Sequence, residues 1–415
     1  MPSLRFPNRP QFSGFMKPCR IEGEVQNLEV VQGEIPPDID GTFYRVMPDP
    51  QFPPFVEDDP RFNGDGNVSA FRIKNGRVSF QQRYVRTEKF VREREGQRAL
   101  MGKYRNKYTD AIEFQIRSTA NTNVIYFNRR LKENSSPYAL DPITLETQGL
   151  STPERQVVWL VAPVVAMIHD FDVTENWVLF PLIPQLCDLE RMKRGGEHWQ
   201  WSPETPFYIG VLPRRGAKST DVKWFRYRNS FPGHTANAFE DQNGLIAFDL
   251  GLSDKNVFFW WPKANGHAPD PSDIHSQLCI DERFSTKAYR HCFFNLMYPS
   301  LGTDFAAIAA LQRLGGGYPL YNAIGHLDLE TGKTEVYFPG PTRMVQEPVF
   351  IPRKGSSREG DGYLLLLVNN YATMASELHL LDVQEGFTKA KAVISLPIRL
   401  RPGLHGNWID AGELR

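Results

Sequence analysis

The sequence has few of the features that mark membrane, secreted or nucleic-acid-binding proteins. It contains no run of about 18 apolar residues that could form a transmembrane helix. Its first residues include no apolar segment of the kind found in signal peptides. Its 48 basic and 48 acidic residues balance, which argues against a broad positive surface for nucleic acid. The four cysteines form no CxxC pair and no regular framework. We therefore expect free thiols in a soluble, cytoplasmic protein with no membrane span, no nucleic-acid partner and no obligate protein partner.

Helical periodicity is also scarce, whereas turn-forming residues are frequent, with 32 glycines and 32 prolines. Two alternating runs, 68–73 and 78–85, are joined across Asn75-Gly76, which is the strongest short-range signal of a β-hairpin. The charged stretch 89–104 is compatible with a short helix. Further strands are expected at 42–46, 122–127, 157–165, 177–182, 208–212, 245–248, 257–261, 363–368 and 378–382.

Many short strands separated by turn signals predict an all-β, closed architecture. The length of 415 residues favours a β-propeller over a small barrel. Known repeat propellers use roughly 40–50 residues per blade, so the chain could supply about seven blades plus insertions. No internal repeat is legible, so periodicity alone leaves the number of blades open. We treat 1–415 as a single domain with an irregular arm at 1–20.

The distribution of histidine is uneven. None of the nine histidines lies in residues 1–168, and three of them lie among small or turn-forming residues at His169, His234 and His405. These three are 65 and 171 residues apart, so only a closed, many-stranded fold could bring them together. A propeller carries one strand of each blade to a central axis, and imidazole suits iron, copper, nickel and zinc. The hypothesis is that the three histidines meet on a metal.

The competing interpretation is that each histidine is structural, as a single histidine usually is. We give that interpretation to the other six, His198, His267, His275, His291, His326 and His379. A metal-bound histidine usually passes its second N–H to a carboxylate or a carbonyl. Glu133 and Glu347 are the candidate carboxylates for that role.

A set of short motifs, in order along the chain, resembles the carotenoid cleavage oxygenases, and within them the fungal stilbene-cleaving (lignostilbene dioxygenase-like) branch. Any one motif is weak, but the ordered set is specific. The motifs are GTFYR at 41–45, FNGDG at 62–66, IHDF at 168–171, GHTANAFE at 233–240, EPVFIPR at 347–353, EGDGY at 359–363 and LHG at 404–406.

The resemblance implies a seven-bladed propeller with a dome of loops and short helices over its axis, where four histidines hold a non-haem Fe(2+). His169, His234 and His405 match the second, third and fourth of these ligands. By the same resemblance Glu133 and Glu347 match carboxylates that support ligand histidines, Tyr104 and Lys132 match the pair that holds a substrate phenol, and Thr122 matches the threonine that crowds a vacant iron position.

The implied activity is that of a dioxygenase that uses O2 to cleave the interphenyl double bond of a small aromatic substrate, a hydroxylated stilbene such as resveratrol, into two aromatic aldehydes. Cleavage of an apocarotenoid is the alternative within the enzyme class. A non-catalytic relative that binds metal or ligand weakly and a plain propeller scaffold for protein partners are the alternatives outside it.

The chain departs from the family pattern in two places. The first iron histidine is absent, and only six residues separate Leu150 from Val157, where a longer stretch of strands is expected. A supporting Glu is also missing just before Ile280-Asp281. These gaps predict that an internal deletion has truncated one blade. Three imidazoles can still hold Fe(2+), although a lost supporting carboxylate typically lowers metal affinity or activity by about 10–100-fold.

Overall fold

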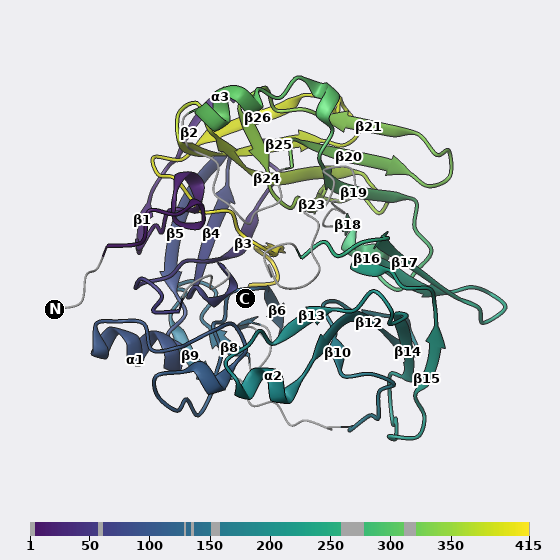
Figure 1. Cartoon of the computed structure of the whole chain (residues 1–415). Helices are drawn as coiled ribbons and strands as arrows, with labels where there is room; N and C mark the ends of the chain where they lie inside the picture. Colours follow the sequence, from purple (N-terminus) through teal and green to yellow (C-terminus); the bar gives the residue numbers. More distant parts are fainter. Residues whose placement is uncertain are drawn as a thin grey trace.

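The computed structural model describes residues 5–56, 61–127, 130–133, 137–150, 158–258, 278–310 and 321–414. These residues form six β-sheets with few helices, which confirms the predicted all-β class. In Figure 1 the sheets surround the middle of the molecule as the blades of a propeller do. None of the described helices is long and apolar enough to cross a membrane. The α-helices are α1 (Glu88–Gly96), α2 (Leu189–Lys193) and α3 (Phe305–Ala310).

The predicted hairpin forms the centre of a five-stranded sheet. Its two strands, β4 and β5, are joined by Asn75 and Gly76, which have φ values of 50° and 71°. Positive φ at both positions is what a tight two-residue hairpin turn requires, and asparagine and glycine tolerate it best. The last strand of the chain, β27, pairs with β3, so the C-terminal segment completes a sheet of N-terminal strands and closes the ring. The order is β1 (Gly23–Val25), β5 (Arg77–Tyr84), β4 (Gly66–Lys74), β3 (Gly41–Pro48) and β27 (Gly406–Asp410).

Three sheets cover the middle of the sequence. The first is β6 (Val124–Phe127), β7 (Arg130–Glu133), β8 (Tyr138–Leu140) and β9 (Thr147–Leu150). The second is β10 (Ala166–Met167), β12 (Trp177–Cys187), β14 (Tyr208–Pro213) and β15 (Lys223–Arg226), with β11 (Asp172–Val173) and β13 (Trp199–Trp201) also paired to β12. The third is the pair β16 (Phe231–Glu240) and β17 (Ile246–Ser253).

The last two sheets lie at the top of Figure 1. One is β18 (Leu278–Ile280), β19 (His291–Leu296), β20 (Ala323–Asp328) and β21 (Thr334–Tyr337). The other is β2 (Glu29–Gly33), β26 (Ala390–Ser395), β25 (Ala375–Asp382), β24 (Gly362–Asn370) and β22 (Arg343–Val345), with β23 (Val349–Pro352) paired to β24. All nine residues of β24 are buried, since one face packs against the hairpin sheet and the other against the β18–β21 sheet.

One expected strand is wrong. Residues 158–165 are irregular, and only the two residues of β10 pair with β12. Trp159, Val161 and Val165 are 84%, 85% and 72% exposed, although large apolar side chains normally gain free energy from burial. This exposure is what a truncated blade would leave beside residues 151–157, which lie outside the described part of the chain. Seven blades and the truncation itself stay predictions.

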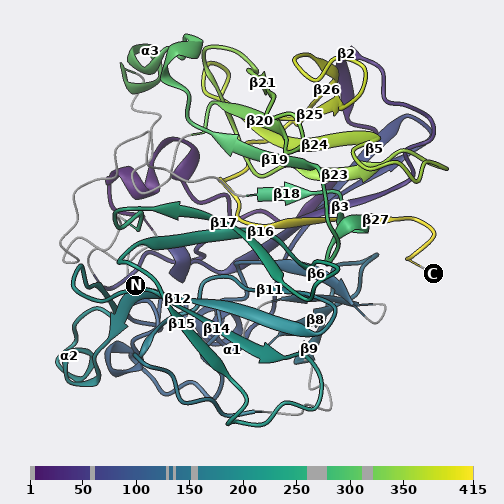
Figure 2. The same ribbon diagram turned by 90° about the vertical axis from the view of Figure 1, so that its right-hand side faces the viewer.

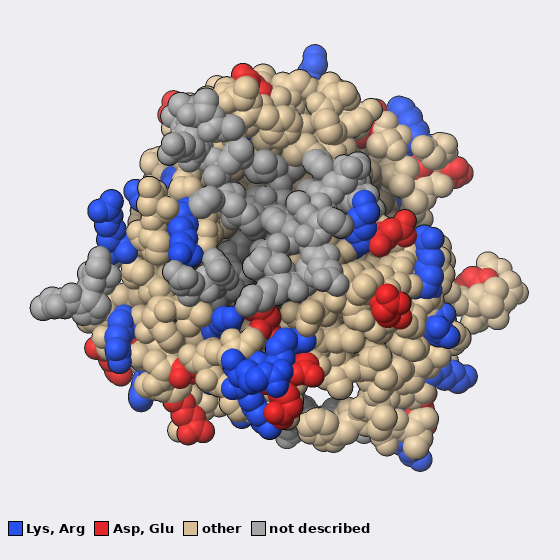
Figure 3. All heavy atoms as spheres, viewed as in Figure 1, with Lys and Arg blue, Asp and Glu red and all other residues tan. Residues whose placement is uncertain are grey.

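The other sequence expectations have mixed outcomes. The stretch 89–104 overlaps helix α1, which ends at Gly96, so residues 97–104 are not helical. The strand expected at 257–261 is irregular at 257–258, and its remainder lies outside the described residues. All four cysteines are free, as predicted. Basic and acidic side chains are interspersed over the face shown in Figure 3, in keeping with the balanced charge.

Candidate metal centre and adjoining cavity

Three sheets deliver the three candidate ligands to the middle of the molecule. His169 follows β10, His234 lies within β16, and His405 directly precedes β27. Strands β16, β18 and β27 lie close to one another in this central region (Figure 2). The backbone is irregular at His169 and His405 and bulged at His234. The register of β16 against β17 shifts between Pro232 and Thr235, where His234 stands.

The imidazole rings form a chain of edge contacts. The Nε2 atoms of His169 and His234 are 3.3 Å apart, and their ring centroids are 5.0 Å apart. The centroids of His234 and His405 are separated by 5.1 Å. Imidazole nitrogens bond to a metal such as zinc at about 2.0–2.1 Å, so two neighbouring ligands of one ion lie about 2.8–3.4 Å apart, depending on whether their angle is octahedral or tetrahedral. The His169–His234 distance fits that requirement.

The protonation of the His169 ring suits a ligand role. Burial, followed by the charge on His234, lowers the pKa of His169 to about 3, so this imidazole is neutral. Burial alone would also lower the pKa of His405, but the carboxylate of Glu347 outweighs it and raises that pKa. Within the described residues, no group of three or more His, Cys, Asp or Glu side chains is arranged so that it could hold a metal ion. The three imidazole rings therefore lie close together, but their arrangement is not that of a complete metal site.

Glu347 orients His405. One carboxylate oxygen lies 2.9 Å from Nδ1 of His405, and the other accepts a 3.0 Å hydrogen bond from the N–H of Gly406. A hydrogen bond from Nδ1–H leaves the lone pair on Nε2, the nitrogen that would bind a metal. Of the two carboxylates expected from the sequence, Glu347 thus has the contact that its role needs.

Asp170 was not singled out from the sequence, although it adjoins a candidate ligand. Its Oδ2 accepts hydrogen bonds from the backbone N–H (2.9 Å) and the hydroxyl (3.1 Å) of Thr235, the residue after His234. Burial favours the neutral acid, but His234 and the Thr235 N–H outweigh it, so the pKa of Asp170 is lowered. The carboxylate therefore joins the segment of His169 to β16, which carries His234, and so links the segments of two candidate ligands.

A cavity of about 230 Å³ adjoins the histidines and has both Tyr104 and Thr122 in its wall. The carbonyl of Thr122 accepts a 3.2 Å hydrogen bond from the N–H of His405. Tyr104 packs against a buried cluster that contains Phe258, whose ring lies 5.2 Å from that of His169. Lys132 and Glu133 belong to β7, where Glu133 pairs with Val124. The side chains of both lie outside the described residues, so their predicted roles are not tested.

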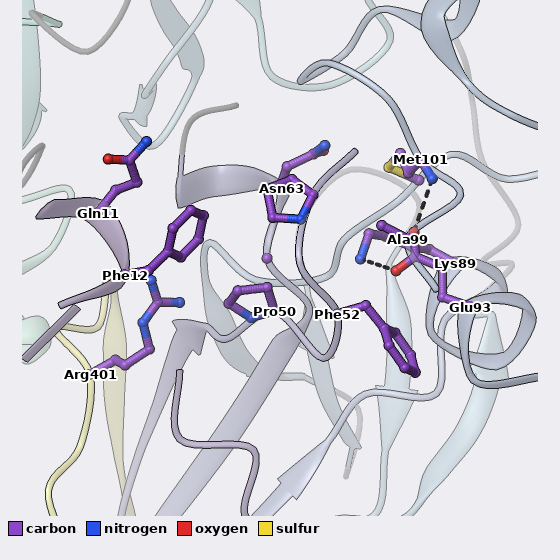
Figure 4. A pocket seen from close by; sticks show the side chains of 12 residues that line it. Gln11, Phe12, Pro50, Phe52, Asn63, Lys89, Glu93, Ala99, Met101 and Arg401 are labelled. Carbon is purple, nitrogen blue, oxygen red and sulfur yellow. Dashed lines mark hydrogen bonds and ion pairs between the residues drawn. The ribbon is translucent and has the colours of Figure 1, made fainter. Parts of the chain in front are cut away.

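A buried ion cluster supports the loop that carries Tyr104. The ammonium of Lys89 lies 2.8 Å from Asp65 and 2.9 Å from Glu93, and all three side chains are buried. Glu93 also accepts hydrogen bonds from the N–H groups of Leu100 and Met101 (2.8 and 2.9 Å). Figure 4 shows Lys89 and Glu93 of this cluster in the wall of another cavity, of about 30 Å³, which contains none of the predicted site residues. The role of the ion cluster around Lys89 is structural, because the cluster fixes the position at which the chain leaves α1 toward Tyr104.

A larger cavity, of about 910 Å³, reaches Glu347 from another side. It lies between β18, β23 and β27 and also includes Glu282. Burial near other carboxylates raises the pKa of Glu282 to about 7. This glutamate follows Ile280-Asp281, the place where the sequence lacks an expected supporting Glu, but no described contact joins it to a histidine.

Comparison with known proteins places the chain in a family. The model of the RPE65 family, described as retinal pigment epithelial membrane protein, matches residues 16–157, 151–278 and 277–410. The match thus consists of three segments, and successive segments overlap at 151–157 and at 277–278, near the two places where the sequence predicts gaps. The three histidines and Glu347 all fall within the matched residues.

Individual relatives agree with that family. Resveratrol cleavage oxygenase 1 of Aspergillus fumigatus is 61% identical, over 99% of this chain and 97% of the relative. Carotenoid cleavage oxygenase 1 of Neurospora crassa is 46% identical, over 100% of this chain and 93% of the relative. The crystal structure of Pseudomonas brassicacearum lignostilbene dioxygenase superposes with a TM-score of 0.89 at 35% identity, over 99% of this chain and 100% of that one. The chain, with its propeller and its central histidines, belongs to the RPE65 family of carotenoid oxygenases.

Proposed function

We propose that this protein is a non-haem Fe(2+) dioxygenase that cleaves the interphenyl double bond of a hydroxylated stilbene, such as resveratrol, into two aromatic aldehydes. One O2 is consumed, and each alkene carbon receives one of its oxygen atoms. The observation that carries the proposal is the meeting of three histidines beside a cavity lined by Tyr104 and Thr122. The relatives named for resveratrol and lignostilbene cleavage support the same substrate class.

The residues present suit iron by their chemistry. Imidazole is a favourable donor for Fe(2+), and sites with three protein ligands on one face of the ion are known for this metal. His169 and His234 would bind through Nε2, as would His405, whose Nδ1 is engaged by Glu347. Glu133 would support a second ligand in the same way. When bound, the iron supplies the activation of dioxygen.

The roles of the other residues follow from the substrate. Tyr104 and Lys132 would hold the phenol of the stilbene, and a nearby cation would favour its phenolate form. The electrons of a phenolate enter the conjugated system and make the double bond more reactive toward an electrophile. Thr122, whose backbone bonds to that of His405, would crowd a coordination position that no ligand fills.

A catalytically impaired relative is the second candidate. The missing first histidine and the exposed apolar side chains of Trp159, Val161 and Val165 favour it. The absence of part of a blade would explain both features. The first histidine would be lost with the missing part, and the residues on either side of the gap would lose packing partners. Cleavage of an apocarotenoid fits less well, since the cavity wall contains two arginines and several amide and hydroxyl groups rather than an apolar tunnel.

Iron content and turnover, measured on the same preparation, test the proposal. The full chain is reconstituted with Fe(2+) without oxygen, freed of excess metal, and assayed for iron per folded chain and for aldehyde release from resveratrol. About one iron per chain together with aldehyde formation is expected. A folded chain that retains no iron would instead establish the impaired relative. Bound iron without aldehyde from any hydroxylated stilbene would refute the proposed substrate class.

A further inference from the structure

Arg105 contributes a positive charge to the cavity that no described acidic group neutralises. The described wall of this cavity includes no Asp or Glu and two arginines, Arg105 and Arg117. Arg117 is paired with Asp110, with Nε 2.8 Å from a carboxylate oxygen. The guanidinium of Arg105 has no hydrogen bond or ion pair among the described residues, and it lies 5.5 Å from the ring centroid of Tyr104. A guanidinium in this setting is available to an incoming anion.

The backbone holds Arg105 in place at a conformational cost. Its φ is 55°, in the left-handed region that residues with a side chain seldom adopt. Two neighbours enforce this conformation. Nδ1 of His198 lies 2.9 Å from the carbonyl of Arg105, and the buried side chain of Asn106 donates to the carbonyls of Met192 and Gly196 (3.0 and 2.7 Å). The loop is therefore fastened to the segment around α2, which fixes where the guanidinium stands relative to Tyr104.

Two residues of the cavity wall connect it to the histidine cluster. The backbone of Thr122 bonds to that of His405, and Tyr104 packs against the buried cluster that contains Phe258, whose ring lies 5.2 Å from that of His169. A substrate that reaches from the histidines into the cavity would accordingly place its far ring near Arg105.

We propose that Arg105 is a specificity-determining residue that binds an anionic oxygen group on the aromatic ring of the substrate, either a phenolate or a ring carboxylate. The proposal rests on the function proposed above and narrows its substrate class. The guanidinium offers two parallel N–H donors, which match a carboxylate in a bidentate manner and also reach a single phenolate oxygen. Its place over the Tyr104 ring, beside the predicted phenol-holding group, lets both act on the same substituent.

Binding to the metal-free protein tests this without requiring turnover. Fluorescence titration compares trans-stilbene-4-carboxylate with its neutral methyl ester. We expect the wild type to prefer the carboxylate, and the Arg105→Gln variant to lose about tenfold of that preference, a modest factor because the arginine is exposed to water. Arg105→Lys retains the positive charge but lacks the paired N–H donors of a guanidinium. Its preference for the carboxylate should lie between those of the wild type and Arg105→Gln. Lys107→Gln removes a positive charge from the same exposed loop outside the cavity wall and should leave the preference unchanged.

A second arm separates the two anions. A difluorinated 4-hydroxystilbene, whose phenol ionises near neutral pH, is titrated at pH 6 and pH 8. Tighter binding at pH 8 in the wild type but not in Arg105→Gln assigns the phenolate, whereas an arginine-dependent preference for the carboxylate alone assigns that group. Equal behaviour of Arg105→Gln and the wild type in both arms, with melting temperatures unchanged, overturns the inference, as does a wild type that binds none of these ligands.

The outcomes remain distinct from those of the proposed function. Arginine-dependent binding in a protein that cleaves no stilbene would refute the activity but not the role of Arg105. Stilbene cleavage that is unaffected by Arg105→Gln would support the proposed activity and refute the role of Arg105.

Discussion

Replacement of Glu347 by glutamine should weaken iron binding while the fold persists. The carboxylate accepts two hydrogen bonds, from Nδ1–H of His405 and from the N–H of Gly406. A glutamine has only one carbonyl oxygen, so its NH2 group must face one of these two donors. The variant therefore loses one hydrogen bond and the negative charge, and the tautomer of His405 is no longer enforced.

The size of the effect follows from that geometry. Loss of a carboxylate that supports a metal-bound histidine typically costs about 10–100-fold in affinity, which is about 1.4–2.7 kcal/mol. The assay is a competition titration of Fe(2+) against a coloured chelator under nitrogen, with circular dichroism to confirm folding. Glu347→Gln should fall within this range.

A second carboxylate–histidine pair supplies the matched control. Glu377 lies 2.8 Å from Nε2 of His379 on β25, in a buried network that also includes Arg343. Glu377→Gln should lower the free energy of unfolding and leave iron affinity unchanged, because no candidate ligand touches that pair. Our reasoning fails if the folded Glu347→Gln variant binds iron within about twofold of wild type, or if both variants lose iron equally.

The remaining predictions concern the ligands, the phenol-holding pair and the buried cation. His234→Ala should abolish stoichiometric iron, whereas His291→Ala, which removes a half-buried imidazole that has no described contact with a candidate ligand, should retain it; metal analysis of both decides the assignment. Tyr104→Phe and Lys132→Met should each lower kcat/KM for hydroxylated stilbenes by more than for their methyl ethers, and equal losses on both substrates would argue against phenol binding. Lys89→Met leaves two buried carboxylates without their cation and should lower the free energy of unfolding by about 3–5 kcal/mol in urea denaturation; a loss below about 1 kcal/mol would show that the cluster contributes little.

Local chemistry made part of the fold predictable from sequence. The hairpin of β4 and β5 was foreseeable because Asn75-Gly76 suits a turn with two positive φ values and because both flanking runs alternate. The strand expected at 157–165 failed for the opposite reason. Its run of valines has strand propensity, but a strand also needs a neighbour to pair with, and only β10 at 166–167 finds one in β12.

The sequence by itself determined which residue types could bind metal and, through the ordered motifs, where to look for them. It supplied His169, His234, His405 and Glu347, because each lies in a local context that a short motif captures. Only the tertiary structure decided that the rings of these histidines meet, that Asp170 joins two of their segments, and that Arg105 stands in the adjoining cavity without an acidic partner. The physical reason is that these contacts join residues of different sheets. The distances between sheets are set when the propeller closes, and no periodicity along a single strand encodes them.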